Sequence, residues 1–199
     1  VREIKKGTKV ILGNTTELSG DFRWPGFGGS SAGASDQDIN KLTVGYGTME
    51  TDQNGAYQWN ATSVKEHKET ENADGTYTIS ITLNEGLKFS DGSAITAKNY
   101  VAGILSFSSP VSVAAGHSGM SGQAFVGYTS FRAYTGADAP EGATKEFAGI
   151  RLLGDYQFSL TVSSDQYPYY FAYTYGAIDP DFLACVLGEG VDVKDDGNG

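Results

Sequence analysis

The sequence predicts an α+β protein with a mixed β-sheet, β-hairpins and several short helices. Residues 76–83 alternate polar and apolar side chains with a period of two, which is typical of a strand with one buried face. Asn-Gly at 54–55 and Asp-Gly at 74–75 are turns of the kind that joins hairpin strands. Thr96 is a suitable N-cap for a helix over 97–107. Together these patterns favour hairpins and short helices over a helical bundle.

The first part of the chain predicts a short strand and then a long loop. The strand is expected over 8–13 and the loop over 14–35, where Gly, Ser and Pro are frequent. Ser35 or Asp36 is expected to cap a short helix. The apolar side chains of that helix, three or four residues apart on one face, are Ile39, Leu42 and Tyr46.

Two hairpins are predicted next. Strands 47–51 and 56–59 are expected to pair around the first Asn-Gly turn, and strands 65–71 and 76–83 around the Asp-Gly turn. The buried face of the last strand would carry Tyr77, Ile79, Ile81 and Leu83.

The helix over 97–107 is expected to turn an apolar stripe toward the core. That stripe consists of Tyr100, Val101, Ile104, Leu105 and Phe107. The small residues of 108–122 predict irregular structure. The aromatic residues that follow recur at a spacing of three, which indicates a buried helical face rather than a row of aromatic side chains that binds a ligand. They are Phe125, Tyr128, Phe131 and Tyr134.

The last part of the chain predicts one more hairpin and two short helices. Strands 147–153 and 157–162 are expected to pair around Gly154, and the helices are expected near 169–175 and 181–187. No internal repeat or separate linker is evident, so residues 1–199 are interpreted as one segment.

The stretch LNEGLKFSDGSAITAKNYVAGI, in which a strand, an aromatic-Ser-Asp-Gly turn and a Thr-capped helix follow one another, resembles the family 5 extracellular solute-binding proteins. KVILGNTTELSG near the start and FAGIRLLGDYQFSLTVSSDQYPYYFAY near the end are similar to further segments of that family, in the same order. The resemblance implies a periplasmic-binding-protein-like (type II) two-lobe fold, of which this chain would be an N-terminal segment without the second lobe. Residues 197–199 look like the start of a Gly-rich motif that leads into that lobe.

The same resemblance implies the substrate-binding component of an ABC importer. Such a protein captures an oligopeptide, or a similar small solute such as nickel or a sugar, and delivers it to membrane permease subunits. It would be a monomer in the periplasm or at the cell surface, lipid-anchored through an N-terminal segment that precedes these residues.

Composition excludes more classes of protein than it suggests, since an acidic surface is ordinary for a secreted protein. The chain has 14 basic and 24 acidic residues and a net charge of −10, which argues against nucleic acid as a partner because phosphate binding needs a basic surface. No apolar run approaches the roughly 20 residues that span a bilayer. Cys185, the single cysteine, is expected to be a buried small apolar residue.

No catalytic residue, metal site or cofactor is predicted. Asp91, the most tempting acid, stands before Gly92 and is interpreted as a turn former. His67 and His117 have no partner at ligand spacing and are interpreted as surface residues. The acidic end, 195–199, lacks the pattern of a calcium loop and is interpreted as a solvated tail.

The long first loop supplies the candidate ligand-binding residues. Aromatic side chains beside hydroxyl groups and flexible glycines are typical of ligand clefts, and the resemblance places this loop at the cleft between the lobes. The residues are Phe22, Trp24, Phe27, Ser30 and Ser31. The alternative is that the aromatic residues only fasten the loop to the core.

Two other classes of protein stay open at this point. A secreted β-rich adhesion or carbohydrate-binding module would explain the Gly, Thr and Tyr content, although the capped helix argues against it. A carboxylate-based hydrolase would need two acids that meet in space, which a sequence does not reveal.

Overall fold

The computed structural model describes residues 7, 9, 11, 13–20, 22, 33–115, 122–168 and 172–199. The chain divides into two units, Val1–Thr43 and Val44–Gly199, and each is considered by itself. Within the described ranges, no helix is both long and apolar enough to cross a membrane.

The first unit contains helix α1, Ala34–Thr43. The helix begins before the predicted caps, because the Gln37 N–H already donates to the Gly33 carbonyl at 3.2 Å. Asp36 instead lies in the first turn, where its carboxylate accepts a hydrogen bond from the Ser19 backbone N–H at 3.0 Å. The predicted apolar face is also wrong, since Leu42 is 86% exposed and Tyr46 lies beyond the end of the helix.

The strand predicted over 8–13 is not found at the described positions of that stretch. Residues 9, 11 and 13 carry no strand structure. A strand needs a neighbour with which to exchange backbone hydrogen bonds, and no described strand pairs with these residues.

The second unit is built on a four-stranded sheet with the order β3-β4-β6-β5. Its strands are β3 (Val64–Glu71), β4 (Tyr77–Leu83), β5 (Ile150–Gly154) and β6 (Gln157–Val162). A separate two-stranded hairpin joins β1 (Met49–Thr51) to β2 (Tyr57–Trp59). Every pairing between these described strands is antiparallel, a more uniform arrangement than the expected mixed sheet.

The three predicted hairpins are confirmed, and the turns of the first two contain glycine where their geometry needs it. Gly55 and Gly75 have φ values of 81° and 82°, a region that glycine enters without steric cost. At the first turn the Asp52 carboxylate also accepts hydrogen bonds from the backbone N–H groups of Asn54 and Ala56, at 2.7 and 2.9 Å.

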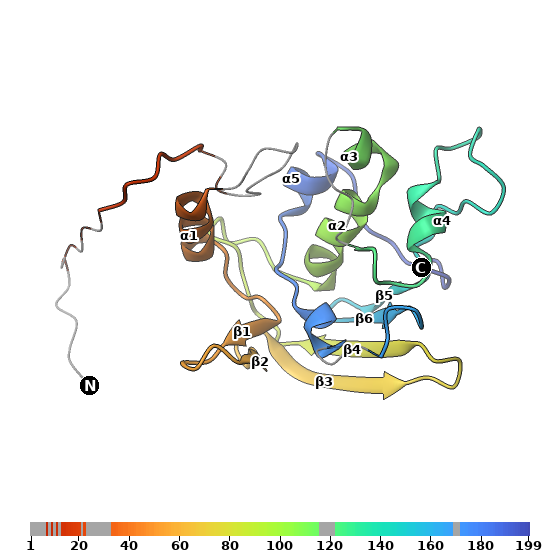
Figure 1. The fold of residues 1–199 in the computed structure, drawn as a ribbon, viewed down its shortest axis with the longest axis horizontal. Coiled ribbons are helices and arrows are strands. Elements are labelled where there is room, and N and C mark those ends of the chain that lie inside the picture. The colour runs from red at the N-terminus through yellow and green to blue at the C-terminus, as the bar shows by residue number, and fades with distance from the viewer. Residues whose placement is uncertain are drawn as a thin grey trace. The chain divides into compact units, whose positions relative to one another are not determined.

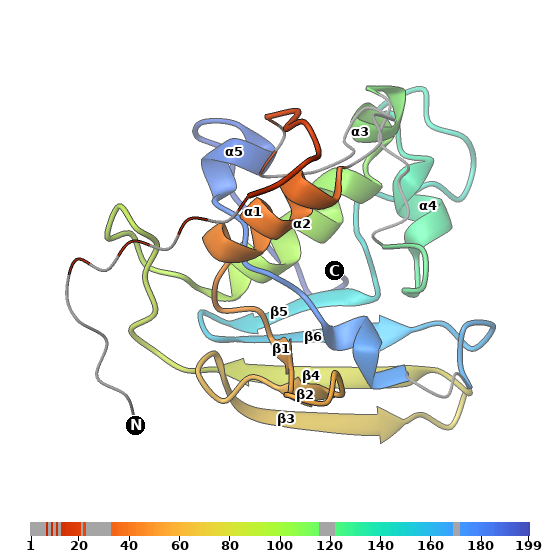
Figure 2. The ribbon, with the colours of Figure 1, turned by 60° about the vertical axis from the view of Figure 1, so that its left-hand side comes forward.

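Helix α2, Ala97–Ser108, packs on one face of this sheet (Figures 1 and 2). The alternation predicted for β4 is confirmed, since Ile79 and Ile81 are 0% exposed, as are Tyr100 and Val101 of the helix. The Tyr100 ring stacks near Phe158 of β6, with centroids 5.7 Å apart. Apolar side chains of the helix and of the two central strands thus form the core.

The remaining helices are short. They are α3 (Pro110–Ala114), α4 (Tyr128–Arg132), the 3-10 helix η3 (Ala172–Gly176) and α5 (Leu183–Leu187). Helix α3 lies in a stretch that was expected to be irregular. The aromatic run predicted as one helical face is only partly helical, because Phe125 forms a bridge with Val162 of β6 and Tyr134 is 37% exposed.

Candidate functional site

The Ser-Asp-Gly turn connects the sheet to α2 as the sequence predicted. The Phe89 N–H donates to the Ser93 carbonyl at 2.9 Å, and the Gly92 N–H donates to the Phe89 carbonyl at 3.0 Å. The Asp91 carboxylate accepts from the Ser93 hydroxyl and backbone N–H, at 2.6 and 2.9 Å. These two bonds lower the pKa of Asp91. Its role as a turn former is therefore confirmed.

Asn99 connects the start of α2 to the segment that precedes α5. Its side-chain carbonyl accepts from the Thr96 backbone N–H at 2.8 Å, which caps the helix. Its amide group donates to the Asp181 carbonyl at 2.9 Å, and the Asp181 N–H donates back to the Asn99 carbonyl at 2.8 Å. The segment that precedes α5 is thus held against the helix.

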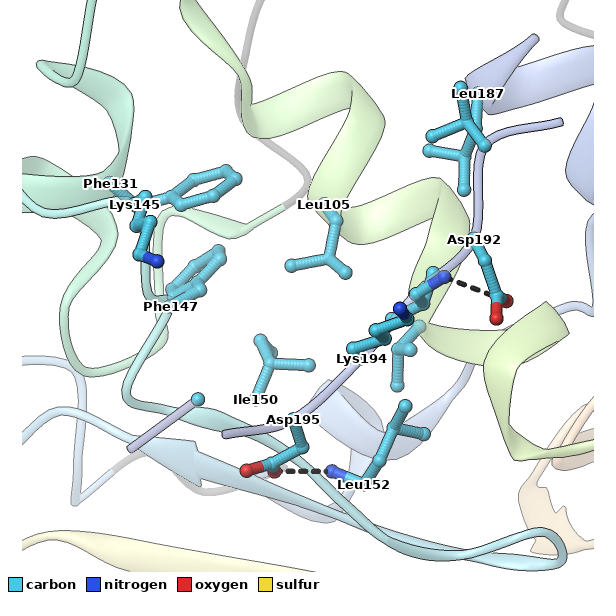
Figure 3. A pocket seen from close by; sticks show the side chains of 14 residues that line it. Leu105, Phe131, Lys145, Phe147, Ile150, Leu152, Leu187, Asp192, Lys194 and Asp195 are labelled. Atoms are coloured by element: carbon cyan, nitrogen blue, oxygen red, sulfur yellow. Dashed lines mark hydrogen bonds between the residues drawn. The ribbon is translucent and has the colours of Figure 1, made fainter. Parts of the chain in front are cut away.

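A cavity of about 190 Å³ lies between α2, β5 and the C-terminal segment (Figure 3). Phe131, Lys145 and Phe147 lie on one side of the view, and Leu187 and Asp192 lie on the other. The lining is mainly apolar, and further members are Val101, Leu105, Ile150, Leu152, Val191, Val193, Lys194, Asp195 and Gly199. We take this cavity as the candidate site of the second unit, because concave apolar surface with a few polar groups is typical of ligand sites.

The wall nearest the C-terminus is an extended segment, residues 190–199, which we call the C-terminal strap. Asp195 anchors it to β5: its carboxylate accepts from Arg151 Nε at 2.8 Å and from the Leu152 backbone N–H at 2.9 Å. Asp192 anchors it to α2 through Lys98 Nζ at 2.6 Å. Val193, between the two anchors, is 7% exposed.

The ion pairs lower the pKa of both Asp192 and Asp195. The hydrogen bond from Arg151 is the main cause that lowers the pKa of Asp195, and the hydrogen bond from Lys98 is the main cause for Asp192. The side chain of Asp195 is 9% exposed. The earlier interpretation of 195–199 as a solvated tail is therefore wrong for Asp195, because a partner 44 residues away draws it onto the sheet.

The two lysines that line the cavity have weaker ion pairs than the two acids, or none. Lys194 makes no ion pair within 4.0 Å with any residue that the structure describes, although its charge contributes to the lowered pKa of Asp192. Lys145 pairs only with its neighbour Glu146, at 3.7 Å, and its side chain is 69% exposed. The cavity thus combines an apolar interior with two lysines and two acids at its rim.

The first-loop residues predicted to bind ligand are mostly not placed. Trp24, Phe27, Ser30 and Ser31 lie outside the described residues. Phe22 is described and half-buried, and its carbonyl accepts a hydrogen bond from Asn40 Nδ2 at 2.7 Å. The loop therefore stays a predicted site.

The cysteine and histidine predictions had different outcomes. Cys185 is exposed, so the prediction of a buried residue is wrong: it lies in the five-residue helix α5, which buries none of its residues. His67 is exposed on the edge strand β3, as predicted, with its ring stacked on Trp59 at 4.4 Å. His117 lies outside the described residues. Among the residues that are described, no group of three or more His, Cys, Asp and Glu is placed to hold a metal ion.

The sequence interpretation missed the cavity. Part of its lining comes from α2 and β5, which were predicted, but another part comes from the C-terminal strap, which was not. No local alternation marks this segment in the sequence, since Val193 is buried whereas Val191, two residues before it, is 52% exposed.

The fold resembles those of solved OppA proteins. OppA of Haemophilus influenzae, in complex with RPPGFSPFR, has a TM-score of 0.54 at 16% identity, over 78% of this chain and 28% of that chain. OppA of Burkholderia pseudomallei has a TM-score of 0.53 at 16% identity, over 77% and 27%. OppA of Listeria monocytogenes, bound to peptide, has a TM-score of 0.50 at 24% identity, over 74% and 27%.

No known family profile and no curated protein sequence matches the chain. The chain spans about a quarter of the length of the solved structures that it resembles. Its α+β architecture is that of part of a periplasmic-binding-protein-like, two-lobe fold.

Proposed function

We propose that this chain is the N-terminal segment, first lobe and associated subdomain, of a family 5 solute-binding receptor of an ABC importer. The full protein would capture an oligopeptide, or a similar small solute, outside the membrane and deliver it to the permease subunits. The observation that carries this proposal is the unit from β4 through the Ser-Asp-Gly turn to capped α2, in a fold shared with peptide-bound OppA structures.

The physical basis for capture is closure of two lobes around the solute. A peptide would be held mainly through its backbone, because backbone groups are common to every peptide sequence, while hydrated pockets accept varied side chains. The first loop, with Trp24, Ser30 and Ser31, is proposed to contribute one wall of that cleft. The second lobe, supplied by further residues of the protein, would contribute the other wall and the charged partners of the peptide termini.

The proposed location is the periplasm or the cell surface, with a lipid anchor attached ahead of these residues and a monomeric receptor. A secreted adhesion or carbohydrate-binding module is the weaker alternative. Such modules are usually nearly free of helix, whereas α2 alone has 12 residues and covers the central sheet.

Calorimetry on the full-length protein that contains this chain tests the proposal. Titration with a mixture of short peptides should show saturable binding, and the isolated 199 residues should bind the same mixture feebly or not at all, because half of the cleft is missing. Tight binding by the isolated chain, or no peptide binding by the full-length protein, would contradict the proposal.

A further inference from the structure

We propose that the cavity between α2, β5 and the C-terminal strap binds a small aromatic carboxylate, with its ring in the apolar interior and its carboxylate at Lys194. This inference concerns the unit Val44–Gly199 alone, so it does not depend on the transport role.

The size and lining of the cavity fit one aromatic ring. An apolar cavity of about 150 Å³ is large enough to bind benzene, and this one measures about 190 Å³. Phe131 and Phe147 stack at its side, with centroids 4.9 Å apart and an interplanar angle of 20°. Val101, Phe147 and Ile150 are each at most 4% exposed, so these walls are held by the core.

Lys194 at the rim favours an anion. Asp192 and Asp195 form ion pairs with Lys98 and Arg151, whereas Lys194 forms no ion pair within 4.0 Å among the described residues, although its charge acts on Asp192. A carboxylate at Lys194 would gain a charge-assisted hydrogen bond at the mouth of a partly desolvated cavity. A neutral ligand of the same shape would gain only the burial of its ring.

The two anchors of the C-terminal strap hold its backbone in place at the rim of the cavity before a ligand binds. These anchors lie on either side of Val193 and Lys194, so the segment that carries the lysine backbone is fixed at both ends. Less ordering is then required on binding, which favours affinity. Lys145 on the other side adds a second, largely exposed positive charge, which pairs with Glu146 at 3.7 Å.

Calorimetry of the 199-residue chain with 3-phenylpropionate at low ionic strength tests this site. We expect saturable binding with a Kd on the order of 1 mM, as befits a ligand of about ten or eleven non-hydrogen atoms. The neutral isostere 3-phenylpropanamide should bind about five- to tenfold more weakly, and added salt should weaken only the acid. Lys194→Met should reproduce the loss for the acid. The matched control Lys65→Met, on the exposed edge strand β3, should not.

A second measurement locates the ligand. Leu105→Trp should fill the cavity and abolish binding while the far-ultraviolet circular dichroism is kept. Independently of that variant, amide resonances of Leu105, Ile150 and Leu187 should shift on titration of the wild-type chain. The site is refuted if no saturable binding occurs up to about 10 mM, if the amide binds as well as the acid, if Lys194→Met has no effect, or if the shifting resonances lie elsewhere.

Discussion

Arg151 and Asp195 form a two-point ion pair that fastens the C-terminal strap to the edge strand β5. Arg151 Nε donates to one carboxylate oxygen at 2.8 Å and Nη2 donates to the other at 3.1 Å. The Leu152 backbone N–H donates to the same carboxylate at 2.9 Å. One acid thus satisfies both a guanidinium group and a backbone donor of the strand.

Replacing this acid should loosen the strap. Asp195→Asn removes the charge-assisted bonds and should lower the free energy of unfolding by about 1–3 kcal/mol at neutral pH. The control is Asp138→Asn, which removes the same charge from an exposed turn residue and should cost less than about 0.5 kcal/mol. Urea unfolding of the two variants measures the difference, and equal losses would contradict the anchoring role.

The same ion pair predicts part of the pH dependence of stability. The pKa of Asp195 is lowered in the folded state by the bond from Arg151, whereas an unfolded Asp titrates near about 3.9. Because the folded state holds the proton less tightly, the contribution is complete above the unfolded pKa and is lost as pH falls through the lowered folded pKa. The wild type should therefore lose more stability than Asp195→Asn below about pH 4. Parallel acid titration curves for the two proteins would contradict this cause.

Gly149 should tolerate no side chain. A Cβ atom there would lie 2.6 Å from the Val126 carbonyl oxygen and 2.7 Å from the Val126 nitrogen, and both are backbone atoms rather than the end of a flexible side chain. We expect Gly149→Ala to cost at least about 2 kcal/mol. Gly45→Ala is the matched control, since its Cβ would meet no atom within 4 Å. Thermal unfolding should show a clear drop in Tm for the first variant only, and a stable Gly149→Ala would refute the close approach.

The buried face of β4 can be tested against its opposite face. Ile81 is 0% exposed and lies between His67 of β3 and Phe158 of β6 in register. Ile81→Ala should cost about 2–5 kcal/mol, because it removes buried methyl groups and leaves a cavity. Ser80→Ala, one position along on the other face, should cost less than about 1 kcal/mol. Similar losses in chemical denaturation would mean that the assigned face is wrong.

The proposed role of the first loop gives a prediction for the full-length protein. Trp24→Ala should weaken peptide binding at least several-fold and leave the melting temperature nearly unchanged, because a cleft wall contributes contacts to the ligand rather than to the core. Calorimetry and thermal unfolding of the same sample separate the two effects. A large loss of stability with unchanged affinity would support the alternative in which the loop aromatics serve packing.

Local patterns predicted much of the second unit. The turns at 54–55 and 74–75 need glycine at a positive φ, which the sequence shows directly. The strands need only alternating apolar residues for one buried face. Residues next to one another in the sequence are therefore enough to predict both. The N-cap at Thr96 follows for the same reason, with Asn99 only three residues away.

Features that depend on distant partners were not predicted. Asp36 was expected to cap α1, but the Ser19 N–H, 17 residues away, determines where its carboxylate points. Phe125 was placed on a helical face, but its bridge to Val162 holds it beside β6. The cavity depends on Arg151 and Asp195, whose contact no local pattern reveals.

Small-angle X-ray scattering of the full-length protein, with and without a peptide that calorimetry shows to bind, tests the central claim most directly. If this chain is one side of a two-lobe receptor, the radius of gyration should decrease measurably when the peptide is added, because the lobes close. A peptide that binds while the radius of gyration stays the same would contradict capture by closure.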